Sequence, residues 1–164
     1  MTVTPFPTVS RIAIESEADA AAIEGAISAV AGLVTAQGGT VALGGRDLLS
    51  MSVEGRALLL GDMYAAGEVI FGWRDPLAGA VRNMSVERLR VLRGDERREC
   101  WRAELYREAE DGDGHILAGA AVEPDAPGIG RRIVEIANDP AAAAQRSPEA
   151  LAAYLADPLG STTY

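Results

Sequence analysis

The chain has 164 residues, of which 48% are apolar and only 5% aromatic, so it can form one ordinary domain with a core of alanine, valine, leucine and isoleucine. Its net charge of −9 disfavours binding to nucleic-acid phosphates, and its single cysteine excludes an intrachain disulfide framework. Every basic residue is arginine; together with the abundant alanine and glycine, this indicates a GC-rich genome and a bacterial or phage protein.

The first segment predicts an extended arm. Residues 1–9 contain Pro5 and Pro7, which do not fit inside a helix. The start has no basic stretch followed by an apolar run, so we expect no signal peptide. No segment approaches the roughly 20 apolar residues that span a bilayer, so we expect no membrane partner. These features predict a protein of the cytoplasm, or of a particle assembled there.

A short strand and a long helix are predicted next. Ile12 and Ile14 alternate with other residues over 10–16, which predicts the strand. Ser16, followed by acidic residues, is typical of a helix start, and the glycines at 38–39 are typical of a helix end. The apolar positions at helical spacing between them are Ile23, Ile27, Val30 and Val34.

Short apolar runs separated by glycines fill residues 40–73. Alternation over 49–53 and 69–73, with a further apolar run at 56–61, is typical of strands. Glycine-containing turn signals stand at 44–45, 54–55 and 61–62. This segment therefore predicts an antiparallel meander.

The second half predicts a hairpin followed by short helices. Residues 84–93 fit a helix or a strand equally well, whereas alternation over 97–106 and the apolar run 115–122 predict a hairpin closed by a Gly-Asp-Gly turn. The remaining segments are a loop at 123–130, a strand or helix at 131–140, helices at 141–146 and 147–157, and a polar tail at 158–164.

Together these elements predict an α+β fold. One long N-terminal helix should pack on a mostly antiparallel sheet, a meander plus a hairpin, with short helices near the C-terminus. We expect an extended arm at 1–9, a single domain at 10–157 and a tail at 158–164.

The segment 110–119, EDGDGHILAG, holds the only histidine, His115. Read as an EF-hand from Asp111, it lacks the required glycine and glutamate, and one histidine with one distant cysteine cannot supply a zinc site. Glycines at 112 and 114, with Asp111 and Asp113 able to cap their own backbone, are what a tight turn needs. The interpretation is a chain reversal; His115 is a weak catalytic candidate and no metal site is predicted.

Cys100 is the other weak catalytic candidate. It lies among arginines, which lower the pKa of a thiol, although a cysteine on one face of a strand explains it equally well. No phosphate-binding loop, dinucleotide fingerprint or nucleophile elbow is present. We therefore predict no cofactor and no catalytic residue beyond these two candidates.

Seven arginines crowd residues 88–107, with acidic residues interleaved so that the charges nearly cancel. Nucleic-acid strips instead combine unmatched positive charge with aromatic platforms. The pattern is typical of a solvated strand face or a polar protein interface, with an anionic ligand as a further reading.

The sequence favours a non-catalytic structural or adaptor subunit of a larger assembly, of which a virion-like particle is one form. Such a subunit acts through protein contacts and its terminal arms. A protein partner or a homo-oligomer is then expected, and nucleic acid is not. Two alternatives stay open. One is a small-molecule binding protein or enzyme with an aromatic-lined pocket between helix and sheet, and the other is an acidic inhibitor or immunity-type protein.

Overall fold

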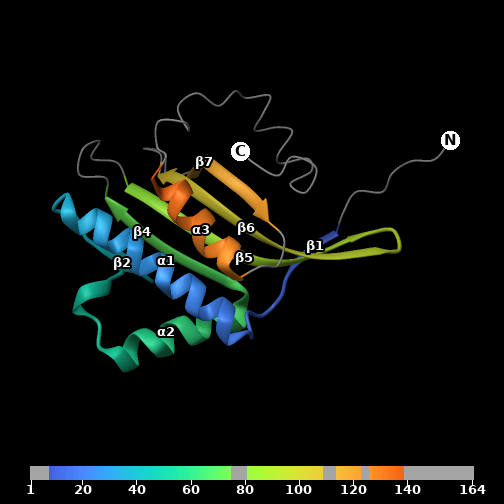
Figure 1. Cartoon of the computed structure of the whole chain (residues 1–164), viewed down its shortest axis with the longest axis horizontal. Helices are drawn as coiled ribbons and strands as arrows, with labels where there is room; N and C mark the ends of the chain where they lie inside the picture. The colour runs from blue at the N-terminus through green and yellow to red at the C-terminus, as the bar shows by residue number, and fades with distance from the viewer. Residues whose placement is uncertain (1–7, 75–80, 109–113, 123–125, 139–164) are drawn as a thin grey trace.

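The computed structural model describes residues 8–74, 81–108, 114–122 and 126–138. Within them an antiparallel sheet of seven strands carries α1 (Glu17–Ala36) and α3 (Ala126–Ala137) on one face (Figure 1). The shorter α2 (Val53–Ala66) lies at the border of this layer (Figure 1). The predicted α+β class, with a long N-terminal helix on an antiparallel sheet, is confirmed.

The strands are β1 (Thr8–Arg11), β2 (Val41–Leu43), β3 (Arg46–Asp47), β4 (Glu68–Arg74), β5 (Val81–Arg93), β6 (Glu96–Glu108) and β7 (Gly114–Val122). Their order is β3-β2-β4-β5-β6-β7, and β1 pairs with β5 beyond the end of β4. The chain thus runs mainly between sequence neighbours, as expected for hairpin-connected strands.

Helix α1 begins and ends where the sequence predicts. The side chain of Ser16 accepts a hydrogen bond from the backbone N–H of Asp19, which satisfies one unpaired donor of the first turn. After the helix, Gly38 adopts a positive φ of 86°. The predicted apolar positions are all buried in the core.

By length and composition α1 could cross a membrane, so the expectation that no segment approaches such a span is wrong. The core helix of a globular protein passes the same test. In this chain Ile23, Ile27, Val30 and Val34 pack against the sheet and α3 in one core cluster. The apolar character of α1 is therefore accounted for by the fold.

Helix α2 corrects the predicted meander. The alternation at 49–53 and the run at 56–61 predicted strands, but the chain forms a 3-10 turn (Leu48–Ser50) followed by α2. The side chain of Ser52 caps this helix by accepting from the backbone N–H of Gly55. The glycines at 55 and 61, expected in turns, lie inside the helix, and Gly67 ends it with a φ of 77°.

Two ambiguous segments are now assigned. Residues 84–93 belong to strand β5, and residues 131–137 belong to helix α3. The predicted loop at 123–130 is wrong from Ala126 onward. Ile129 and Ile133 lie on the buried side of α3, which explains why this segment is a helix. The predicted helices and tail from residue 139 to the end lie outside the described residues.

The first strand is displaced from its predicted position. It occupies Thr8–Arg11, so the last two residues of the predicted arm are paired, and residues 1–7 lie outside the described part. The backbone N–H of Ile12 donates to Arg88 on β5, and that of Ile14 donates to Tyr64 on α2. The chain thereby leaves the sheet and brings Ile14 into the core.

The two central strands are longer than their neighbours. Strand β4 pairs with residues 81–87 of β5, and β7 pairs with residues 101–108 of β6. Residues 88–100 therefore project beyond both strands, flanked only by β1 among the described strands (Figure 1). We call residues 88–100 the projecting hairpin.

Candidate protein-interaction surface

His115 is the second residue of β7 and lies opposite Arg107 of β6. The predicted β6–β7 hairpin is thus present, while its reversal at 109–113 and the histidine side chain lie outside what the structure describes. Among the described residues no group of three or more His, Cys, Asp or Glu side chains could hold a metal ion.

Cys100 is buried, with 3% of its surface exposed, and lies opposite Leu89. It forms a small apolar cluster with Leu89 and Val91 on the face of the sheet that points away from α1 and α3. Cys100 and Arg107, the partner of His115, are seven residues apart on β6, which is roughly 23 Å at the rise of a strand. The two weak catalytic candidates therefore do not meet.

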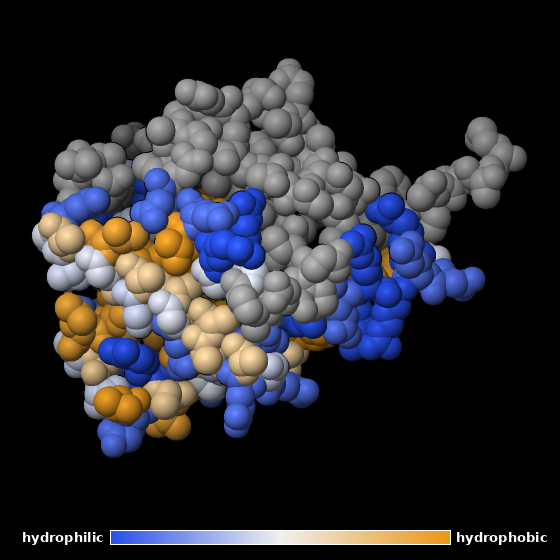
Figure 2. Space-filling view, in the orientation of Figure 1, coloured by the Kyte–Doolittle hydropathy of each residue, from blue (hydrophilic) through white to orange (hydrophobic). Residues whose placement is uncertain are grey.

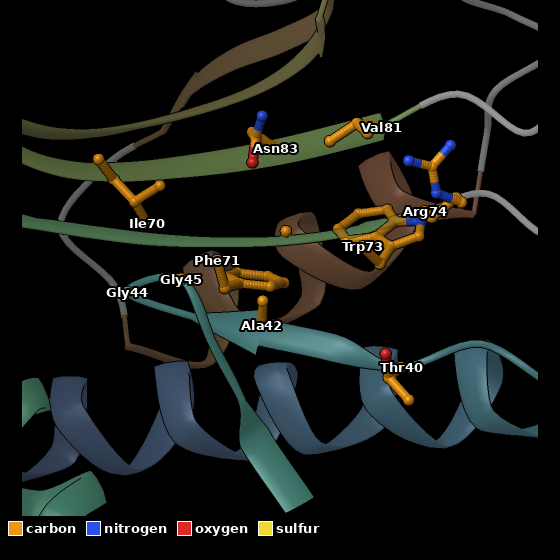
Figure 3. Close-up of a pocket in the computed structure, with 11 residues that line it drawn as sticks. Thr40, Ala42, Gly44, Gly45, Ile70, Phe71, Trp73, Arg74, Val81 and Asn83 are labelled. Carbon is orange, nitrogen blue, oxygen red and sulfur yellow. The ribbon is translucent and has the colours of Figure 1, made fainter.

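A shallow cavity of about 290 Å3 lies over β2, β4 and the start of β5 (Figure 3). Ala42, Ile70 and Val81 give it apolar walls, and the side chain of Asn83 lies over Gly72. A Cβ at Gly72 would collide with that side chain and lie 2.8 Å from the carbonyl of Arg82. The cavity is on the sheet itself, not between helix and sheet as expected, and neither weak catalytic candidate lines it.

A network of charged side chains occupies the same sheet face near the base of the projecting hairpin. Buried Glu87 accepts hydrogen bonds from Arg11 at 2.9 Å and from Arg102 at 2.9 Å. Arg11 also pairs with Glu68 at 2.7 Å, and Arg102 pairs with Glu104 at 3.2 Å. The network ties β1, β4, β5 and β6 together at one point.

The environment shifts several pKa values in this network. The hydrogen bond to Glu87 raises the pKa of Arg11. Burial raises the pKa of Glu68, an effect that exceeds the opposing one of Arg11. Burial and the hydrogen bond to Glu104 raise the pKa of Tyr106, which therefore stays protonated and donates to that carboxylate. Such shifts also occur in structural ion-pair networks, and every member here has a charged or hydrogen-bonded partner.

The projecting hairpin concentrates positive charge. It holds five arginines and three acidic residues, a net charge of +2 in a chain whose total is −9. Figure 2 shows this side of the hairpin as mostly hydrophilic, whereas hydrophobic groups reach the surface around α2. The mixed-charge run noted in the sequence is therefore a local basic surface on an acidic molecule.

On the hairpin face continuous with the core, three arginines surround one carboxylate. Glu99 pairs with Arg88 at 3.2 Å, with Arg90 at 3.6 Å and with Arg97 at 3.6 Å. The guanidinium of Arg88 also lies over the ring of Trp101, 5.1 Å from its centroid. Among the described residues Arg88 Nη1, Arg90 Nε and Trp101 Nε1 have no acceptor.

Exposed leucine and valine side chains gather near α2. The exposed fractions are 65% for Leu49, 84% for Val53 and 73% for Leu58. Only Leu60 of α2 is fully buried, so most of this helix faces away from the core. Single exposed apolar side chains are common on folded domains, whereas a contiguous group of them is typical of a contact surface.

Sequence reasoning found the arginine-rich run but not its division between two faces. Arg88, Arg90 and Arg97 lie on the core side of the sheet plane, whereas Arg98 and Arg102 lie on the other. That division depends on 84–93 being a strand, which the sequence left open. The signal for it was the alternation of Val86, Arg88 and Arg90, which the helical spacing of the leucines obscured.

Comparison with known proteins gives no matching family model, no matching curated protein and no matching solved structure.

Proposed function

We propose that this protein is a non-catalytic subunit of a larger protein assembly and that the projecting hairpin is one of its contact elements. The observation that carries the proposal is the hairpin itself. Eleven residues of paired strand and a two-residue turn extend beyond both neighbouring long strands and beyond the helices (Figure 1). Among the described strands only the four-residue β1 flanks it.

A hairpin of this kind gains little from the core of its own domain. Two-stranded hairpins are marginally stable in water and need a third strand, a helix or another surface. Strand β1 supplies a third strand only along residues 89–92. Apolar Leu92 near its tip is 40% exposed, and β1 is exposed along its whole length. A partner that covers these groups would stabilise the hairpin and bury them at the same time.

The exposed apolar groups around α2 support the same proposal, because a second uncovered surface lets one subunit contact two neighbours. The terminal arms stay part of the proposal. Residues 1–7 immediately precede β1 in the chain, and β1 pairs with the hairpin.

The test is the oligomeric state of the pure full-length chain, measured by light scattering. In a matched variant an Asn-Gly turn replaces residues 92–97 and joins Val91 to Arg98, which are already partners in the register. We expect the wild-type chain to assemble and the shortened variant to be monomeric with an unchanged circular dichroism spectrum. If the pure wild-type chain stays monomeric over a wide concentration range, that result would contradict a self-assembling subunit.

The cavity of Figure 3 favours one second candidate, a small-molecule binding protein. It offers apolar walls and one amide, that of Asn83, but no pair of groups for acid–base chemistry among its lining residues. Saturable chemical-shift changes around Ile70 on addition of small apolar fragments, lost in Ile70→Glu, would support this candidate. No saturable change with such fragments would exclude it.

A further inference from the structure

We propose that the projecting hairpin binds the acidic N-terminal half of α1 in a second copy of this chain, through Arg90 and Arg97. This inference depends on the proposed function, since it names the partner and the contact of the assembly. It rests on a surplus of donors on the hairpin, a matching row of acids on α1, and the spacing of the two sets.

The donors outnumber their acceptors on the hairpin. Each arginine carries five N–H groups, yet Glu99 is the shared carboxylate of Arg88, Arg90 and Arg97. Arg90 and Arg97 keep 35% and 58% of their side-chain surface exposed. They can therefore reach a carboxylate on another molecule without any change in the strands.

The acids of α1 have no basic neighbours along the chain. Residues 12–45 contain four acidic residues, three of them in the first two turns of α1, and no arginine. Glu17 and Glu24 are both exposed and lie two turns apart on one side of the helix. Between and beyond them are small side chains, Ala21 and Ser28, over which a strand can approach closely.

The two sets of charges match in spacing. Glu17 and Glu24 are seven residues apart, which is about 10.5 Å along a helix axis. Arg90 and Arg97 are diagonal neighbours across β5 and β6, about 7–8 Å apart. Long arginine side chains cover the difference, so both pairs can form at once.

The partner copy follows from the direction of the hairpin and from charge. In its own chain the hairpin extends away from α1 (Figure 1), so it cannot lie on that helix. A copy of the same chain supplies the acidic surface, because the chain as a whole carries a net charge of −9 while the hairpin carries a net charge of +2. Interleaved acids in the hairpin, including Glu96 and Glu99, disfavour a nucleic acid in the same place.

Charge reversal tests the contact. The variant Arg90→Glu/Arg97→Glu and the variant Glu17→Arg/Glu24→Arg should each self-associate at least about tenfold more weakly than wild type. Mixed in equal amounts, the two variants should assemble again, because each supplies the surface that the other needs. A chain with all four changes should assemble with itself.

The matched control is Arg46→Glu/Arg131→Glu, which reverses two exposed arginines outside the hairpin and should assemble like wild type. Thermal melts check that every variant folds. If wild type assembles and the hairpin variant does too, the inference is wrong while the proposed function stands; a monomeric wild type overturns the inference and contradicts a self-assembling subunit. Loss of assembly after nuclease treatment, or failure of the mixture to recover, would also overturn the inference.

Discussion

Strands β5 and β6 pass through two regions of different character, the body under the helices and the projecting hairpin. In the body the side chains that point toward the helices are apolar, as Met84, Val86 and Leu105 are, and each is almost fully buried. In the hairpin the same side of the same strands carries Arg88 and Arg90. The side chains change from apolar to charged where the helices stop covering the sheet.

This difference indicates that the body provides the stability of the fold and the hairpin provides contacts with other molecules. The body buries a continuous core between the sheet and its helices, whereas the buried apolar groups of the hairpin form only a small cluster of Leu89, Val91 and Cys100. Burial of apolar surface is the main favourable contribution to folding. We therefore expect changes in the body to unfold the protein and changes in the hairpin to alter its association.

The largest effect is expected from Phe71→Ala. Phe71 is 1% exposed and stacks on Trp73 with ring centroids 6.0 Å apart. Its truncation should lower the free energy of unfolding by about 3–5 kcal/mol. The hairpin counterpart, Leu92→Ala, should change it by less than about 0.5 kcal/mol. Chemical denaturation of both variants measures this, and equal losses would show that the hairpin contributes to the core as much as the body does.

The second effect concerns the junction of the two regions. Gly67 has a φ of 77°, and a Cβ there would collide with the carbonyl of Ile12, which follows β1. Gly67→Ala should cost about 2–3 kcal/mol, because it adds that collision to the strain of a positive φ.

The matched control is Gly38→Ala. It has a similar φ of 86° but open space around the Cβ position, so it should cost only about 1 kcal/mol. If the two substitutions lower the melting temperature equally, the close approach of Ile12 to Gly67 does not occur in solution.

Part of the fold could be predicted from the sequence. The cap at Ser16 and the spacing of the apolar residues in α1 are local signals, and the structure agrees with both. The prediction for residues 49–61 was wrong because their apolar positions fit a period of two. The cap at Ser52 and the glycine at 67 were the signals of a helix. Local periodicity is ambiguous in short apolar runs, and tertiary burial of Leu60 resolves it.

The candidate surface was less predictable. It depends on which residues face each other across β5 and β6, and a shift of one residue exchanges the two faces of a strand. The sequence gives the arginines but not this register. The ion pairs of Arg11 were also hidden, because Glu68 and Glu87 are 57 and 76 positions away and come near only through the sheet.

Replacing Glu87 tests whether the ion pairs hold β1 to the junction. Glu87 is 4% exposed and accepts from both Arg11 and Arg102. Glu87→Gln keeps the shape but removes the charge, and should cost about 1–2 kcal/mol. The control Glu99→Gln, in the more exposed hairpin cluster, should cost less than about 1 kcal/mol. Hydrogen exchange should quicken at β1 in Glu87→Gln; unchanged exchange there would contradict its role in holding β1.

The smallest effect is one of pH, at Glu68. Burial raises the pKa of this carboxyl, so the folded chain holds the proton more tightly than the unfolded chain does. Its contribution to the free energy of unfolding therefore falls as pH rises from about 4.5, the ordinary value, through the raised pKa. Glu68→Gln removes this dependence, so the stability of wild type minus that of the variant should decrease over that window. If the difference increases instead, the pairing with Arg11 outweighs burial. The ionised form of Glu68 then stabilises the junction rather than destabilising it.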